Sequence, residues 1–129
     1  MKERLPRDKH DFERVRTLYE IERNELIALL PEILTWLQDI NWPIAIEVAE
    51  LLLNKIPRET ISIVIEVLKG EDEIWKENCL RYFVMKLPKV LLEIDNLKSE
   101  ITRIANQPTE EEKIEEIHIT AQQIIMINS

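Results

Sequence analysis

Apolar residues recur three and four positions apart along most of this chain, a spacing that predicts amphipathic helices. The predicted helical faces are Phe12, Val15, Leu18 and Tyr19; Ile33, Leu34 and Leu37; Ala45, Val48, Ala49 and Leu52; Ile61, Val64, Ile65 and Leu68; Trp75, Cys79 and Tyr82; Val90, Leu91, Ile94, Leu97, Ile101 and Ile104; and Ile114, Ile117, Ala121, Ile124 and Ile125. Turns are expected near residues 39–42, 70–73 and 105–109. We therefore predict an all-α fold.

Residues 36–43 indicate a helix end, a tight turn and a new helix start. Asp39 and Asn41 are expected to accept hydrogen bonds from the free N–H groups of the following helix, with Pro43 in its first turn. A similar turn recurs around Asp72 and Trp75, 33 positions after Asp39 and Trp42, and Asp72 is expected to be the N-cap of the helix that follows. These residues define a repeated structural motif.

Three junctions place an apolar residue before proline: Leu30-Pro31, Ile56-Pro57 and Leu87-Pro88. Each predicts the start of a helix, because proline is tolerated in a helix's first turn. Together with the 33-residue period, the junctions predict a short α-solenoid of the HEAT or armadillo type. It would hold about three antiparallel helix pairs and an N-terminal capping helix in a single domain, residues 1–129. The alternative is an irregular bundle in which the two turns coincide by chance.

Local signals predict further details of these helices. Asp8 is expected to be the N-cap of the first helix, and Thr109 and Glu112 have the spacing of a capping box. The acidic cluster at residues 110–116 is expected to lie in solvent. Trp42 and Trp75 are expected to be buried packing residues at the helix corners.

Composition fits a folded helical domain. The 129 residues are 45% apolar and 33% charged, which is typical of globular proteins. The single glycine argues against a β-sandwich, a phosphate-binding loop or a Rossmann turn, because these need glycines at positions of positive φ or close backbone approach.

Charge and cysteine content limit the partners and the location. The formal net charge is −8, which disfavours nucleic acid and anionic membranes as partners. Cys79 is the only cysteine, so no disulfide framework can form, and a reducing compartment is expected. With no signal peptide or membrane-spanning run evident, the sequence predicts a cytoplasmic protein.

The sequence contains no recognised catalytic or cofactor-binding motif, so we expect neither an enzyme nor a cofactor. His10 lies between Asp8 and Asp11, but helix initiation explains these carboxylates better than a metal site or an acid–base site. No metal ligands are predicted.

Several stretches resemble DUF5071, a family of small uncharacterised bacterial proteins. They are Asp8-Lys9-His10-Asp11, Trp36-Leu37-Gln38-Asp39-Ile40-Asn41-Trp42-Pro43, the turn at Asp72, Ile74 and Trp75, and Pro108-Thr109-Glu110-Glu111-Glu112. The resemblance spans nearly the whole chain and implies an all-helical, HEAT-like domain. It implies no activity and no catalytic residues.

Two functional hypotheses follow. The first is a small acidic module, an adaptor or an immunity-type inhibitor, that binds another protein of basic charge. Its candidate surface is a strip of polar residues on the two middle repeats: Glu47, Glu50, Asn54, Lys76, Glu77 and Arg81. The acidic last helix around Glu111 and Glu115 is the next surface to consider. The second hypothesis is a small-molecule or catalytic site at the Trp42 and Trp75 corners, with Asp39, Asp72 or His10.

Overall fold

The computed structural model describes residues 2–128, and these form helices and connecting turns without a β-strand. The predicted all-α fold is thus confirmed. The α-helices are α1 (Phe12–Leu18), α2 (Arg23–Leu34), α3 (Ala45–Lys55), α4 (Pro57–Lys69), α5 (Glu73–Tyr82), α6 (Leu97–Asn106), α7 (Glu110–Ile114) and α8 (Ile117–Ile127). The 3₁₀ segments are η1 (Lys2–Arg4), η2 (Thr35–Gln38), η3 (Val84–Lys86) and η4 (Lys89–Asn96). None of the helices in this range has the length and apolar content needed to cross a membrane.

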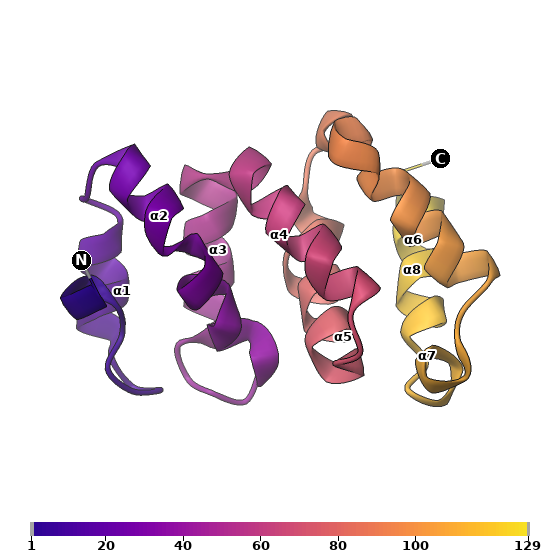
Figure 1. The fold of residues 1–129 in the computed structure, drawn as a ribbon, viewed down its shortest axis with the longest axis horizontal. Coiled ribbons are helices and arrows are strands. Elements are labelled where there is room, and N and C mark those ends of the chain that lie inside the picture. Colours follow the sequence, from indigo (N-terminus) through magenta and orange to yellow (C-terminus); the bar gives the residue numbers. More distant parts are fainter. Residues whose placement is uncertain (1, 129) are drawn as a thin grey trace.

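The helices advance along the long axis of the molecule in chain order (Figure 1). Helix α4 contacts both α2 and α6, and these three form one layer. Behind them, α1 contacts α3, and α5 contacts α8, with η2 bridging α3 and α5. From α1 to α6, consecutive helices thus lie in alternate layers, and one continuous apolar core fills the space between the layers.

The predicted faces supply most of this core. Fully buried side chains include Leu37, Leu52, Ile61, Leu68 and Cys79, drawn from both layers. Because an amphipathic helix is stabilised mainly by the burial of its apolar face, the periodic pattern was sufficient to locate these residues.

Two side chains of α5 bind backbone carbonyls at the end of α2 and in η2. The Trp75 indole N–H donates to the Leu34 carbonyl at 3.2 Å, and the Asn78 amide donates to the Leu37 carbonyl at 2.8 Å. A helix end leaves carbonyls without intrahelical partners, so these bonds satisfy groups that burial would otherwise penalise. They also connect α5 to the end of α2 and to η2.

The two tryptophans do not play the equal roles that were expected. Trp75 is half-buried and packs against the core. Trp42 is half-buried outside the core cluster and packs edge to face on Trp36, with ring centroids 5.4 Å apart. The prediction that both tryptophans are buried is therefore wrong: each is only half-buried, and Trp42 also lies outside the core cluster.

The turn at Asp39 also differs from the turn at Asp72. Asp72 is the predicted N-cap and accepts from the Trp75 backbone N–H at 3.1 Å. Asp39 instead accepts from the Asn41 N–H within the turn, and α3 begins only at Ala45, two residues after Pro43. The expected capping of the next helix by Asp39 or Asn41 is therefore wrong.

The first helix begins later than predicted. Asp11, not Asp8, is the N-cap of α1, and its buried carboxylate accepts from the Arg14 backbone N–H and from the Arg7 side chain. The Arg7 guanidinium holds the pKa of Asp11 well below its usual range. Asp8 caps only the local turn, by accepting from the His10 N–H at 2.9 Å.

Three predicted helices have different boundaries. Pro31 lies inside α2 rather than at a helix start, because Leu30 and Ile33 on either side are both in the core. The helix expected after Pro88 breaks at Asp95 and Asn96, whose φ angles are 50° and 67°. The last helix divides into α7 and α8 at Glu116, with a φ of 60°.

We predict that Asn78→Ala lowers the free energy of unfolding by about 1–3 kcal/mol, the usual cost of leaving a buried polar group without a partner. Chemical denaturation monitored by circular dichroism measures this change. Gln123→Ala, on the exposed side of α8, is the control and should change stability by less than about 0.5 kcal/mol. Equal stability of the two variants would contradict a structural role for the Asn78 amide.

Candidate protein-binding surface

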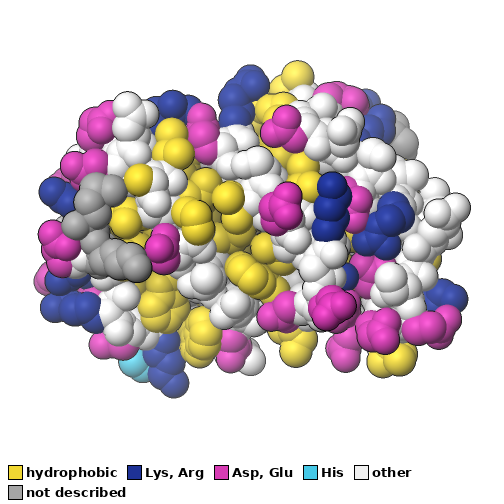
Figure 2. Space-filling model, in the orientation of Figure 1, with side chains coloured by type: hydrophobic (Ala, Val, Ile, Leu, Met, Phe, Trp, Pro, Cys, Tyr) yellow, Lys and Arg dark blue, Asp and Glu magenta, His cyan; other side chains and the backbone are white. Residues whose placement is uncertain are grey.

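A groove of about 500 Å³ lies between the α4–α5 turn and α7. Its walls are Glu71, Asp72, Glu73, Ile74, Glu111, Ile114 and Glu115, which we call the acidic groove. Figure 2 shows acidic and hydrophobic side chains together along the lower right edge, where Figure 1 places the start of α5 and α7.

Most carboxylates of the acidic groove form no ion pair, and Lys69 lines the adjoining cavity with Glu71 and Glu111 without pairing with them. Glu73 pairs with Lys76, and Asp72 caps α5. Glu71, Glu111 and Glu115 are exposed and make no ion pair within residues 2–128. Carboxylates without counter-charges, collected in a concave site, raise the local concentration of cations and of basic segments.

Two isoleucines are exposed among these carboxylates. Ile74 at the start of α5 is 60% exposed, and Ile114 at the end of α7 is 74% exposed. Single exposed apolar residues are common on protein surfaces, but this pair lines the same groove. The acidic groove therefore offers apolar contact as well as negative charge.

A buried charge cluster fixes one wall of the groove. The Glu112 side chain is fully buried, and one of its oxygens accepts from Lys76 Nζ and from Arg103 Nη2, both at 3.0 Å. Its other oxygen accepts from Arg103 Nη1 at 3.0 Å and from the Thr109 backbone N–H at 2.8 Å. Lys76 also pairs with Glu73 at 2.9 Å, and Arg103 with Glu100 at 2.9 Å.

The local sequence explains how Glu112 comes to face inward. Thr109 is the N-cap of α7 and accepts from the Glu112 N–H, while the Glu112 side chain accepts from the Thr109 N–H, so the predicted capping box is confirmed. This reciprocal pair folds the Glu112 side chain back toward the start of its helix. The expectation that the whole 110–116 cluster is solvated is wrong for Glu112.

The cluster also determines the protonation of Glu112. Burial acts to raise its pKa, but hydrogen bonds from Arg103, Thr109 and Lys76 outweigh burial and lower the pKa to about 2. The same contacts raise the pKa of Arg103. Glu112 is therefore ionised throughout the neutral range, and its ion pairs hold α7 against α5 and α6.

The predicted strip of polar residues is only partly exposed. Glu47, Glu50 and Asn54 lie on the exposed side of α3, and the Asn54 amide donates to the Tyr19 hydroxyl at 3.4 Å. Lys76 was expected on the surface, but its side chain is 3% exposed within the charge cluster. That expectation is wrong because a carboxylate from a distant helix meets the Lys76 ammonium.

Glu77 and Arg81, the remaining members of the strip, are bound to α8. Arg81 Nε donates to Glu77 at 3.1 Å, and the Thr120 hydroxyl donates to the same carboxylate oxygen at 2.8 Å. Glu77 is half-buried and Arg81 is exposed. These two residues therefore serve the contact between α5 and α8, where Thr120 is buried.

The alternative site at the tryptophan corners gains only the acidic groove, whose wall includes Asp72 of the Trp75 corner. None of the cavities described here has a tryptophan in its wall. His10 is exposed, and residues 2–128 contain no group of three His, Cys, Asp or Glu side chains placed to hold a metal ion. The Ile44 N–H, directly after the motif at residues 36–43, donates to the Lys9 carbonyl at 3.2 Å and so connects this region to the motif at residues 8–11.

The model of a family described as a domain of unknown function, DUF5071, matches residues 4–125. The chain belongs to the DUF5071 family. Comparison with curated proteins finds no significant match. The description of the DUF5071 family names no activity.

The charge cluster predicts a specific pH dependence of stability. Glu112 has a pKa of about 2 in the folded protein, below its ordinary value of 4.5, so its stabilising effect is complete above pH 4.5 and is lost as the pH falls toward 2. We predict that Glu112→Gln lowers the free energy of unfolding at pH 7 by about 3–5 kcal/mol, because two cations lose a buried partner. The difference from the parent should shrink between pH 4.5 and pH 2.

Urea titrations at a series of pH values measure this difference. Glu111→Gln is the matched control, since Glu111 is the exposed neighbour on the same helix. It should change stability by less than about 0.5 kcal/mol at any of these pH values. A deficit in Glu112→Gln that stays constant down to pH 2 would show that the lost interaction does not depend on the charge of Glu112.

Proposed function

We propose that this DUF5071 protein is a small acidic protein-binding module whose acidic groove receives a basic segment of a partner protein. The observation that carries the proposal is the set of three exposed carboxylates without ion pairs, Glu71, Glu111 and Glu115, beside two exposed isoleucines. The matching partner segment presents lysine or arginine on either side of an apolar residue.

Charge and apolar contact contribute to binding in different ways. Long-range attraction between the acidic groove and a basic segment accelerates encounter and weakens as salt is added. Contact with Ile74 and Ile114 excludes water, and this slows dissociation. A partner that used charge alone would bind many acidic surfaces equally well, so the isoleucines are the source of selectivity.

Rigid walls favour the acidic groove over other acidic parts of the surface. Glu111 and Glu115 are on α7, which the Glu112 cluster fixes, and Asp72 is held by its bond to the Trp75 N–H. A surface that is ordered before binding loses less conformational entropy on association. Glu47 and Glu50 on α3 form a second acidic surface and provide a matched comparison.

The proposed setting is the cytoplasm, where the protein acts as an adaptor or an immunity-type inhibitor that masks a basic surface. A buried, unpaired cysteine supports this placement. Cys79 is completely enclosed in the core, and burial, with the nearby negative charge of Asp72, raises the pKa of its thiol. Such a thiol is unreactive and fits a reducing compartment.

We propose a HEAT-like stack as the architecture, which the alternating layers support.

The test uses a fluorescent amphipathic peptide of lysine and leucine, with a glutamate and leucine peptide as the opposite-charge control. Fluorescence anisotropy at low and moderate salt measures the affinity. We predict that Glu111→Lys/Glu115→Lys weakens binding of the basic peptide by about tenfold or more, since each reversal replaces an attraction with a repulsion. Ile74→Ser/Ile114→Ser should also weaken binding, while leaving its salt dependence unchanged.

Glu47→Lys/Glu50→Lys is the decisive control, because it changes the net charge by the same amount on another face. Preserved affinity in this variant supports the acidic groove. If both double reversals weaken the affinity for the basic peptide equally, the peptide responds to the overall charge of the protein and not to the acidic groove. If only the α3 variant loses affinity, the interface lies on α3. Circular dichroism melting curves identify any variant that is unfolded.

A further inference from the structure

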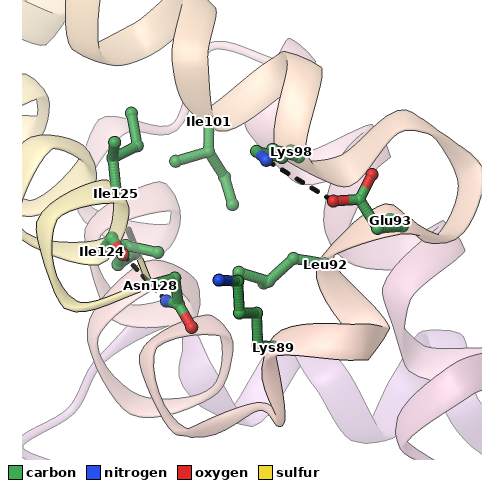
Figure 3. Close-up of a pocket in the computed structure, with 8 residues that line it drawn as sticks. All are labelled: Lys89, Leu92, Glu93, Lys98, Ile101, Ile124, Ile125 and Asn128. Atoms are coloured by element: carbon green, nitrogen blue, oxygen red, sulfur yellow. Dashed lines mark hydrogen bonds and ion pairs between the residues drawn. The ribbon is translucent and has the colours of Figure 1, made fainter.

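A second cavity lies at the C-terminal end of the helix stack, between η4, α6 and α8 (Figure 3). Its volume is about 130 Å³, and its apolar wall consists of Leu92, Ile101, Ile124 and Ile125. Three of these residues belong to the buried core, and Ile125 is half-buried. The cavity shares no residue with the acidic groove.

The rim of this cavity carries a positive charge within a protein of strongly negative net charge. Lys98 pairs with Glu93 at 3.5 Å, which leaves Lys89 as the uncompensated charge. Lys89 makes no ion pair or side-chain hydrogen bond within residues 2–128. Figure 3 shows the Lys89 amine directed toward the space enclosed by the other labelled residues.

The backbone break at Asp95 and Asn96 produces this arrangement. Their left-handed conformation reverses the chain between η4 and α6, so that Leu92 before the break and Ile101 after it line the same cavity. Lys89 and Lys98 reach the rim from the same two elements. A continuous helix would separate these side chains along its length.

Size and charge together define the ligand class. An engineered apolar cavity of about 150 Å³ binds benzene, so a space of similar volume accommodates an apolar body of that size. Two lysines and one glutamate give the rim a net charge of +1, which complements a single anionic group. A dianion would leave one charge without a partner at an apolar site.

We propose that this cavity binds a small monocarboxylate with an apolar body about the size of a benzene ring. The apolar body would replace water against Leu92, Ile101 and Ile124, and the carboxylate would pair with the Lys89 ammonium. This site is independent of the proposed protein-binding function.

Sodium benzoate is the probe, and benzyl alcohol and benzylamine are its neutral and cationic counterparts. Isoleucine methyl NMR spectra of the full chain report the cavity directly through Ile101, Ile124 and Ile125. We expect saturable shifts of these methyl signals with benzoate, weaker shifts with benzyl alcohol and none with benzylamine. Lys89→Met should weaken benzoate binding about tenfold, because an ion-paired hydrogen bond is lost.

Lys86→Met is the matched control, because Lys86 is an exposed lysine that does not line the cavity. It should leave benzoate binding unchanged. Ile125→Phe should fill the space and abolish binding while the protein stays folded. Shifts that do not saturate in the millimolar range, equal affinity in both lysine variants, or equal binding of benzylamine would each overturn the proposal.

Discussion

The burial of one carboxylate, that of Glu112, constrains the C-terminal half of the molecule. A charged group removed from water is stable only where opposite charges and hydrogen bonds compensate it. Lys76 from α5, Arg103 from α6 and the backbone of Thr109 supply that compensation. Helix α7 has only five residues and would not persist alone, so these contacts are what hold it against the stack.

The same constraint shapes the surface charge. The cluster holds two cations, Lys76 and the partly exposed Arg103, among three carboxylates, Glu73, Glu100 and Glu112. The carboxylates just outside, including Glu111 and Glu115, are left without cationic partners. The surface next to the cluster therefore keeps an excess of negative charge at the acidic groove, and α7, which carries Glu111 and Glu115, cannot shift without breaking the ion pairs of the buried Glu112.

Backbone ends and breaks shape the rest of the stack. Trp75 and Asn78 reach back to the carbonyls of Leu34 and Leu37, which allows the end of α2 to be buried without an unsatisfied acceptor. The reversal at Asp95 and Asn96 shortens the helix at the other end and opens the small cavity beside α8. Regular packing of the helices accounts for the core. The buried end of α2 and the break at Asp95 and Asn96 account for the positions of the buried polar groups and of the residues that line the small cavity.

The sequence by itself determined the features that depend on neighbours a few residues apart. The helical faces around Val48, Ile61 and Ile104, the N-cap at Asp72 and the capping box at Thr109 all follow from spacings within one or two turns. The acidic character of the last helical segment was also visible, although the sequence did not show that Ile74 and Ile114 would line a groove with it.

Only the tertiary structure decided which polar residues are buried and which prolines interrupt a helix. Lys76 and Glu112 are 36 positions apart, so no local pattern could show that each is the partner of the other. Helix α2 continues through Pro31 because burial of the neighbouring residues in the core stabilises the fold by more free energy than the missing backbone hydrogen bond costs. Local interactions act within a few residues, whereas charge compensation and core burial depend on segments that meet only after the chain has folded.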